Sequence, residues 1–235
     1  KINRRLSKIA QVNNLALATG SQSVALHDKE AVHSFKVVRE NDPTGFIIAT
    51  LGASHGIEDA LKAIEMTAAQ ALEIHLNPAQ ELVMPEGDRE FYWLEQLTGL
   101  IRQSPVPVII KEVGMGLSPK TLAKLQKIGV QYIDVAGYGG TNFIEIENER
   151  RHRKEYSFLK NVGLSTAKSL LAAQKFSNDF SITASGGIRT ALDIVKCLAL
   201  GADNVGISGF FLHTLIKQGD EGLDRTVKDL KKQIA

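Results

Sequence analysis

Three polar residues alternate with apolar ones near residue 75, and they are the strongest candidates for chemistry in the sequence. Glu73, His75 and Asn77 occupy every second position of the run LEIHLN, and leucine or isoleucine fills the positions between them. Successive side chains of a strand point to opposite faces, so the three polar groups share one face. Burying three polar groups without partners is costly. The pattern therefore favours a functional role for the set.

The residues after this run add an amide and a carboxylate. Pro78 ends the strand and leaves Gln80 and Glu81 on the following loop. An isolated loop carboxylate is usually just solvated. Beside a phosphorylated ligand, however, Glu81 is a candidate oxygen ligand for Mg²⁺, an ion usually held by one or two carboxylates together with substrate phosphates.

A lysine stands where another strand should end. Lys111 directly follows the apolar run VPVII at 106–110. A lysine in this place can form a Schiff base, pair with a structural carboxylate, or face an electron-rich cofactor. The residues alone do not separate these three roles.

Glycine-containing turns follow the last apolar runs of the chain, in SITASGGIR, NVGISG and GYGGTNF. Glycine lets backbone N–H groups approach an anion closely, and a helix N-terminus favours negative charge. Such turns are common in any α/β protein, but two of them at the last two strands favour a phosphate site. The candidate contacts are Thr141, Gly186, Gly187, Arg189, Ser208 and Gly209.

Seven short apolar runs alternate with helical patterns along the chain. The runs lie at 15–21, 45–50, 71–76, 106–110, 130–135, 180–184 and 203–207. Helical spacing covers 1–16, 57–70, 89–103, 118–128, 163–175, 189–200 and the end of the chain, where a short helix opened by Ser208 and Gly209 precedes a longer one. This alternation predicts βαβ units and a parallel sheet.

The predicted fold is a TIM (β/α)8 barrel forming a single domain over residues 1–235. A closed barrel needs eight strands, and the chain opens in a helix, so we expect the first strand upstream of residue 1. A doubly wound sheet is the alternative architecture. Its glycine fingerprint would usually follow the first strand, whereas here the glycine turns come late.

Composition excludes several classes of function. The 235 residues carry a net charge of +2, which is too near neutrality for a protein that coats nucleic acid. No apolar run approaches the roughly 18 residues of a membrane span, and the first residues are too polar for a signal peptide. We therefore expect a cytoplasmic protein with no nucleic-acid or membrane partner. The single cysteine, Cys197, excludes an internal disulfide, and its helix spacing predicts burial.

The other histidines offer no ligand spacing. They are His27, His33, His55, His152 and His213. Structural or surface roles are the default expectation for each.

Several motifs in order resemble one enzyme family. HLNPAQE, PEGDREF, KEVG, DVAGYGGTNF and TASGGIR together resemble the type 2 isopentenyl-diphosphate delta-isomerases, which are FMN-dependent TIM-barrel enzymes. The resemblance implies interconversion of isopentenyl diphosphate and dimethylallyl diphosphate with reduced FMN and Mg²⁺, and with NADPH as the reductant of the flavin. It also implies a homo-tetramer or homo-octamer.

The resemblance implies a role for each matching residue. FMN is expected at Ser21, Thr50, Lys111, Thr141, Gly186, Gly187, Arg189, Ser208 and Gly209. The substrate is expected at Ser21, Gln22, Ser23, His75, Asn77 and Gln80, and the metal at Glu81. The expected catalytic residues are Gln80, His75 and Lys111. Of these, Lys111 would stabilise the anionic reduced flavin, and the neutral Gln80 would orient the substrate or relay a proton.

Four positions depart from the family pattern. The family usually has Asn at Thr50, Arg at Ser23, Ser at Ala136 and Arg at Tyr138. Together these changes remove one cation that would bind diphosphate. Two rival functions follow: an FMN-dependent oxidoreductase on the same barrel, and a flavin-binding paralogue without catalysis. The expected His-Gly-Gly-Arg turn or loop cysteine of the oxidoreductases is not present in the sequence.

Overall fold

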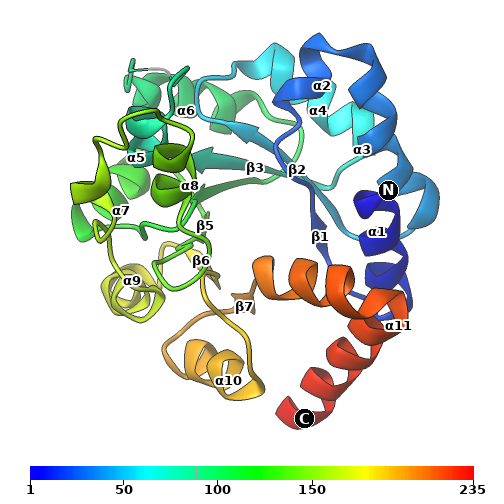
Figure 1. Ribbon diagram of the computed structural model, residues 1–235. Coiled ribbons are helices and arrows are strands. Elements are labelled where there is room, and N and C mark those ends of the chain that lie inside the picture. The colour runs from blue at the N-terminus through cyan, green and yellow to red at the C-terminus, as the bar shows by residue number, and fades with distance from the viewer. Residues whose placement is uncertain (88) are drawn as a thin grey trace. The chain divides into compact units, whose positions relative to one another are not determined.

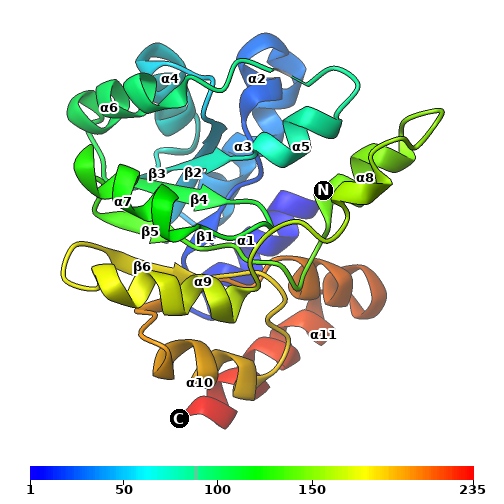
Figure 2. The ribbon, with the colours of Figure 1, turned by 90° about the vertical axis from the view of Figure 1, so that its left-hand side faces the viewer.

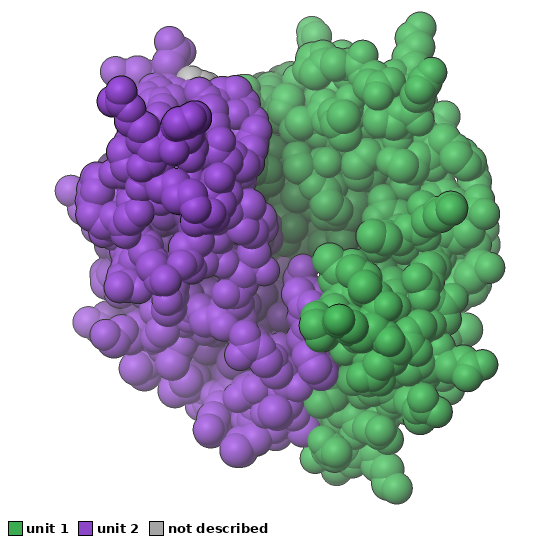
Figure 3. All heavy atoms as spheres, in the orientation of Figure 1, with its two compact units in different colours: residues 1–75, 96–109, 211–235 green, residues 76–95, 110–210 purple. Residues whose placement is uncertain are grey.

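The computed structural model describes residues 1–87 and 89–235. Asp88, in the PEGDREF motif, lies outside the described residues. The chain divides into two units (Figure 3). Unit 1 comprises residues 1–75, 96–109 and 211–235, and unit 2 comprises residues 76–95 and 110–210.

Helices and short strands alternate along the chain (Figure 1). In chain order they are α1 (Ile2–Val12), β1 (Leu17–Ala18), α2 (Ser23–His27), α3 (Lys29–Asn41), β2 (Ile47–Gly52), α4 (Ile57–Thr67), β3 (Ala71–Leu76), α5 (Pro78–Val83), α6 (Trp93–Gln103), β4 (Val108–Glu112), α7 (Pro119–Lys127), β5 (Tyr132–Asp134), α8 (Phe143–Glu149), η1 (Ser157–Leu159), α9 (Thr166–Ala173), η2 (Gln174–Phe176), β6 (Ser181–Ala184), α10 (Ala191–Ala199), β7 (Asn204–Val205) and α11 (Gly209–Ile234). Among the described helices, none has the length and apolarity needed to cross a membrane.

The strands of the described residues pair in chain order, from β1 to β7. In unit 1, β1 pairs with β2 and β2 with β3, and in unit 2, β5 pairs with β6 and β6 with β7. These pairs are all parallel, which confirms the predicted parallel sheet. The register places Gly52, the last residue of β2, opposite His75 on β3.

In unit 1, the first helix packs against the last one. Ile9 of α1 forms a buried cluster with Leu215, Leu223 and Val227 of α11. The axis of α11 turns at Gly219, whose φ of 77° is not helical (Figure 1). This turn confirms the predicted short helix ahead of a longer final one.

In unit 2, α5 and α8 lie side by side (Figure 2). Val83 of α5 and Ile144 of α8 are fully buried and form a cluster with Met115. Cys197 on α10 is also buried, as predicted, and burial raises the pKa of its thiol. A buried thiol of raised pKa is a weak nucleophile.

One arginine holds two loops of unit 1 together. The guanidinium of Arg39, on α3, donates to carbonyl oxygens at the end of α4 and in the turn before β2, at 2.9–3.2 Å. It also donates to Gln70 Oε1, which accepts the N–H of Ile47 at the start of β2. Arg39 therefore satisfies backbone oxygens that would otherwise lie at helix and turn ends without a protein donor.

Replacing Arg39 by Met should destabilise the fold without creating a cavity. Met keeps much of the aliphatic stem but leaves the carbonyl oxygens without these donors, so we expect a loss of about 2–3 kcal/mol in the free energy of unfolding. Urea unfolding followed by circular dichroism measures it. Lys36→Met on the exposed face of the same helix is the control. Equal stability of the two variants would contradict the role given to Arg39.

Candidate active site

The glycine turns after β5 and β6, both in unit 2, lie in direct backbone contact. Gly186 and Gly187 have φ values of 99° and 80°. A Cβ on Gly186 would lie 2.1 Å from the carbonyl oxygen of Gly137, and one on Gly187 would lie 2.6 Å from that of Gly139. Because no side chain fits at either position, both glycines are required for the close packing of the two turns.

Side chains around these turns hold them in place. Thr166 Oγ1, at the start of α9, lies 3.0 Å from the carbonyl oxygen of Ser185 and 2.6 Å from that of Gly186. Arg189 Nη2 donates to the carbonyl oxygen of Gly139 at 3.2 Å. Arg189 thus spans from the turn after β6 to the turn after β5.

The turn after β7 approaches the same place. A Cβ on Gly209 would lie 3.4 Å from Thr141 Oγ1, an ordinary van der Waals contact. The structure therefore brings the hydroxyl of Thr141 to the start of α11, next to Ser208. Within unit 2, the hydroxyl of Thr141 therefore lies at the beginning of a helix, where backbone N–H groups have no partner inside the helix.

A buried carboxylate stands near Lys111 and was not foreseen from the sequence. Asp134 ends β5 and is 5% exposed. It accepts hydrogen bonds from Ser185 Oγ at 2.8 Å and from the N–H of Ala136 at 3.0 Å. Burial raises the pKa of Asp134, and the charge of Lys111 opposes this rise. The bond from the N–H of Ala136 to Asp134 supports the left-handed backbone of Ala136, whose φ is 35°.

A second buried carboxylate, that of Glu112, ends β4 next to Lys111. Its Oε2 accepts the N–H groups of Val113, Gly114 and Met115 at 2.6–3.0 Å. Burial raises the pKa of Glu112 to about 7, although these N–H groups and Lys111 act in the opposite direction. Lys111 Nζ itself donates to the backbone oxygen of Glu112 at 2.6 Å. Because burial raises the pKa of both Glu112 and Asp134, these carboxylates offset the positive charge of Lys111 less than ionised ones would.

The residues after β3 form hydrogen-bonded pairs in unit 2. Asn77 Nδ2 donates to Glu81 Oε1 at 2.7 Å. Gln80 Nε2 donates to Glu147 Oε1 at 3.2 Å, and the other oxygen of Glu147 accepts from Arg150 at 2.5 Å. Glu147, buried on α8, was not foreseen from the sequence. Glu147 holds the amide of Gln80, and the orienting role of Gln80 stays a prediction.

Two of the predicted contacts in unit 1 are buried in local hydrogen bonds. Gln22 is fully buried, donates to the carbonyl oxygen of Ala63 at 3.0 Å, and accepts the N–H of Thr50 at 3.2 Å. Thr50 Oγ1 donates to Glu73 Oε2 at 3.3 Å. Gln22 therefore positions the loop after β1 against β2 and α4.

The neighbouring residues of that loop are more accessible. Ser21 is exposed and Ser23 is partly exposed. Their hydroxyl oxygens lie 2.9 Å apart, and Ser23 Oγ lies 2.8 Å from His55 Nε2. His55, for which a structural or surface role was expected, therefore belongs to this group of side chains.

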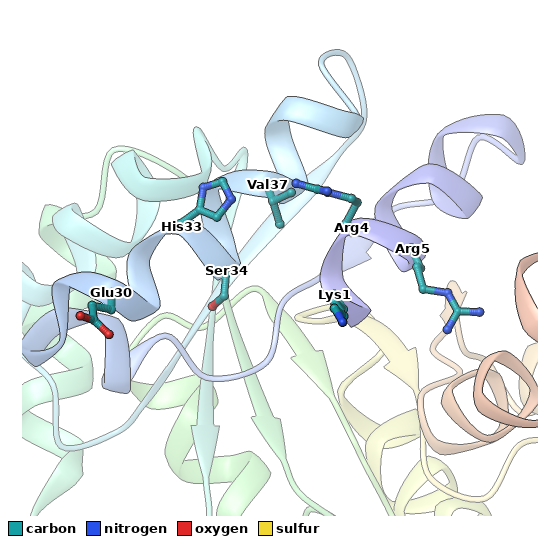
Figure 4. A pocket seen from close by; sticks show the side chains of 7 residues that line it. All are labelled: Lys1, Arg4, Arg5, Glu30, His33, Ser34 and Val37. Atoms are coloured by element: carbon teal, nitrogen blue, oxygen red, sulfur yellow. The ribbon is translucent and has the colours of Figure 1, made fainter.

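A pocket of about 520 Å³ also lies in unit 1, between α1 and α3 (Figure 4). Lys1, Arg4 and Arg5 line it from α1, and Glu30 and His33 are among its lining residues from α3. The predicted site residues do not line it.

The comparisons with known proteins identify the family. The family model described as FMN-dependent dehydrogenase matches residues 21–235. The chain belongs to the FMN-dependent dehydrogenase family. Solved structures agree in fold with this family assignment. The flavin-binding domain of baker's yeast flavocytochrome b2 is 15% identical, with a TM-score of 0.68, and the match covers 99% of this chain and 59% of that chain. A mandelate oxidase mutant is 14% identical, with a TM-score of 0.63, over 99% and 67% of the two chains. With the parallel strand order, this likeness confirms the predicted α/β fold of the TIM-barrel type.

The curated relatives of this chain are named as isomerases. The chain is 57% identical over 219 residues to the isopentenyl-diphosphate delta-isomerase of Latilactobacillus sakei, a match covering 93% of this chain and 63% of the relative. It is 47% identical over 233 residues to the isopentenyl-diphosphate delta-isomerase of Listeria monocytogenes, covering 98% and 64%. The chain thus spans less than two thirds of the length of these relatives.

The described residues fit an FMN phosphate and, more sparsely, Mg²⁺. Thr141 Oγ1 lies near Gly209 at the start of α11, and backbone N–H groups at a helix start suit the phosphate group of FMN. The cation of Lys111 suits an anionic ring system. Among the described residues, no group of three or more His, Cys, Asp or Glu side chains could hold a metal ion. A Mg²⁺ ion at Glu81 would therefore need substrate phosphate oxygens to complete its shell.

The raised pKa of Glu112 makes the stability of the fold depend on pH. Between pH 4.5 and about 7 the folded state holds a proton that the unfolded chain releases, so the free energy of unfolding should fall as pH rises through this window, by up to about 3 kcal/mol. Glu112→Gln keeps an oxygen acceptor and cannot ionise. Its stability should therefore vary less with pH than that of the native protein.

Urea unfolding at half-unit intervals from pH 5 to pH 8 tests this expectation. Glu65→Gln, at an exposed position on α4, is the control. If Glu112→Gln and the native protein show parallel stability curves over this range, Glu112 is already ionised in the folded state at pH 5.

Proposed function

We propose that the protein is an FMN-dependent isomerase that interconverts isopentenyl diphosphate and dimethylallyl diphosphate. The observation that carries the proposal is the group in unit 2 that combines Lys111, held by the backbone oxygen of Glu112, with the glycine turns beside Thr141 and Ser208. Family membership supports FMN as the cofactor. The isomerase names of the curated relatives support the substrate pair.

The glycine turns and the start of α11 hold the phosphate of FMN in this proposal. Backbone N–H groups at the start of α11 and the hydroxyls of Thr141 and Ser208 donate to phosphate oxygens. Arg189 adds a positive charge beside them. Gly186 and Gly187 contribute through the close packing of their turn. Ser21 and Thr50 stay predicted flavin contacts.

Lys111 stabilises negative charge on the cofactor. Reduced FMN, once bound, supplies an electron-rich ring that stabilises positive charge at the tertiary carbon of the substrate and exchanges its protons. NADPH serves as the reductant that loads the flavin with electrons. Lys111 is held by the backbone oxygen of Glu112, so its ammonium group is positioned before the cofactor binds.

The polar residues of β3 and α5 orient the substrate. His75, Asn77 and Gln80 contact the diphosphate or the alkene, and Glu81 holds Mg²⁺ against the diphosphate. The bond from Gln80 Nε2 to Glu147 holds the amide of Gln80 through its nitrogen. A neutral amide is a poor acid, so Gln80 orients rather than donates the proton. We further propose that the protein acts in the cytoplasm as a homo-tetramer or homo-octamer.

Anaerobic incubation with reduced FMN, Mg²⁺ and isopentenyl diphosphate tests the function. Conversion to dimethylallyl diphosphate is the expected result. Oxidation of a 2-hydroxy acid with no isomerisation would favour the FMN-dependent oxidoreductase instead. Tight flavin binding with neither activity would favour a paralogue without catalysis.

The phosphate site is tested by Ser208→Asp rather than by a glycine variant. Any side chain at Gly187 would collide with Gly139 and disturb the fold. An aspartate at 208 puts a negative charge beside the FMN phosphate, so we expect the affinity for FMN to fall at least about tenfold. Fluorescence titration with FMN measures it. Ser177→Asp, at an exposed position, carries the same charge change and should bind FMN like the native protein. Unchanged affinity in Ser208→Asp would place the phosphate elsewhere.

The metal site is tested by Glu81→Gln. The amide keeps an oxygen that Asn77 Nδ2 can reach and removes the charge that attracts Mg²⁺. The Mg²⁺ concentration for half-maximal turnover should rise about tenfold or more, with FMN still bound. Glu149→Gln, at an exposed position on α8, is the control. If Glu81→Gln and the control need the same Mg²⁺ concentration, the assignment of Glu81 is wrong.

A further inference from the structure

Ser23, His55 and Asp59 form a continuous chain of hydrogen bonds in unit 1. Ser23 Oγ lies 2.8 Å from His55 Nε2, and His55 Nδ1 lies 2.9 Å from Asp59 Oδ2. Ser21 Oγ lies 2.9 Å from Ser23 Oγ and extends the chain by one hydroxyl. The groups come from the loop before α2, the start of α2, the turn between β2 and α4, and the first turn of α4.

The carboxylate of Asp59, at one end of these hydrogen bonds, holds Nδ1 of the His55 imidazole. The hydrogen bond from His55 lowers the pKa of Asp59, so its carboxylate is ionised near neutral pH. An ionised acceptor keeps a proton on Nδ1. Nε2 is the ring nitrogen that faces Ser23. Lys62 Nζ lies 3.5 Å from the other oxygen of Asp59.

A glycine places His55 beside His75. A Cβ on Gly52, the last residue of β2, would lie 3.2 Å from His75 Cε1 and 3.9 Å from His55 Cδ2. The two rings therefore flank the same point of the backbone. Around His55, the polar groups brought by neighbouring elements are Ser23 of α2, Asp59 and Lys62 of α4, His75 of β3, and Gln96 of α6, which donates to the carbonyl oxygen of Ser54.

We propose that His55 is a positioning residue for the diphosphate of the substrate and acts through Ser23. This inference rests on the proposed function. When Nε2 is protonated it donates to Ser23 Oγ, so the hydrogen of the Ser23 hydroxyl is free to donate to a phosphate oxygen. The imidazolium also adds a positive charge close to the anion. When Nε2 is neutral it accepts the hydrogen of Ser23, and both contributions to diphosphate binding are lost.

The same order of hydroxyl, imidazole and carboxylate also occurs in serine hydrolases, where neutral imidazole takes the proton of the serine. That reading gives Ser23 a nucleophilic role. The two readings differ in the active form of His55: protonated for diphosphate binding and neutral for nucleophilic attack. Experiments on charge and on serine reactivity therefore separate them.

His55→Gln is the variant that tests the proposal. Its amide can still donate to Ser23 but can neither titrate nor carry a charge. We expect its KM for isopentenyl diphosphate at pH 6 to rise about tenfold, with little change in kcat. His33→Gln, at an exposed position on α3, should keep the native KM.

A compensating substitution and a binding measurement complete the test. Ser23→Arg supplies a permanent charge at the same place, so adding His55→Gln to it should cost little further affinity. Calorimetry with inorganic pyrophosphate at pH 6 measures binding without turnover. The affinity of His55→Gln for pyrophosphate should be about tenfold weaker than native. Native affinity in this variant would overturn the proposal for His55 even if the isomerase is active.

Two further outcomes separate the inference from the function on which it rests. Weaker pyrophosphate binding by His55→Gln in a protein without isomerase activity would support the anion site and overturn the proposed function. Covalent labelling of Ser23 by a fluorophosphonate, abolished in His55→Gln, would show a nucleophilic serine and overturn the proposal for His55.

Discussion

The contact between two backbone turns in unit 2 is the constraint on which the candidate phosphate site depends. The turn with Gly137 and Gly139 meets the turn with Gly186 and Gly187 so closely that no Cβ fits between them. This closeness brings Arg189 within reach of the neighbouring turn. These glycines allow the two backbone turns to pack together. The candidate position for an anion is therefore near Thr141 and Ser208 and not at these glycines. A glycine after a strand therefore does not by itself mark a phosphate contact.

Buried charge at the end of β4 determines what Lys111 can do. A lysine paired with two fully ionised carboxylates would be neutralised, and an anionic cofactor would gain little from it. Burial instead raises the pKa of both Glu112 and Asp134. The backbone oxygen of Glu112 holds the ammonium group in place, and the shift of both carboxylates toward their neutral forms leaves positive charge for a ligand. The Schiff-base and simple ion-pair roles explain this arrangement less well, because neither requires two carboxylates of raised pKa.

The sequence predicted the repeating elements better than the contacts between them. All seven predicted apolar runs contain strands, because short β-branched runs bounded by glycine are a local signal. The segment of α5 was expected to be a loop, because Pro78 was predicted to end the strand before it. In the structure Pro78 instead occupies the first turn of a helix, a position that proline favours. Glu147 and Gln80 are 67 residues apart, and Ser23 and His55 are 32 apart. No periodicity within either segment could have joined them.

The side chains of the candidate site share one physical feature: each reactive or binding group is held by a hydrogen bond to a neighbouring residue. Asn77 is held by Glu81, Gln80 by Glu147, and Lys111 by the backbone of Glu112. Ordering a long side chain costs conformational entropy, and these bonds meet that cost during folding instead of during ligand binding. The bond from His55 to Asp59 follows the same rule. Because Asp59 holds Nδ1, the orientation of the His55 ring does not depend on whether Nε2 carries a proton. The charge that an anion meets at Nε2 can therefore change while the ring stays in place.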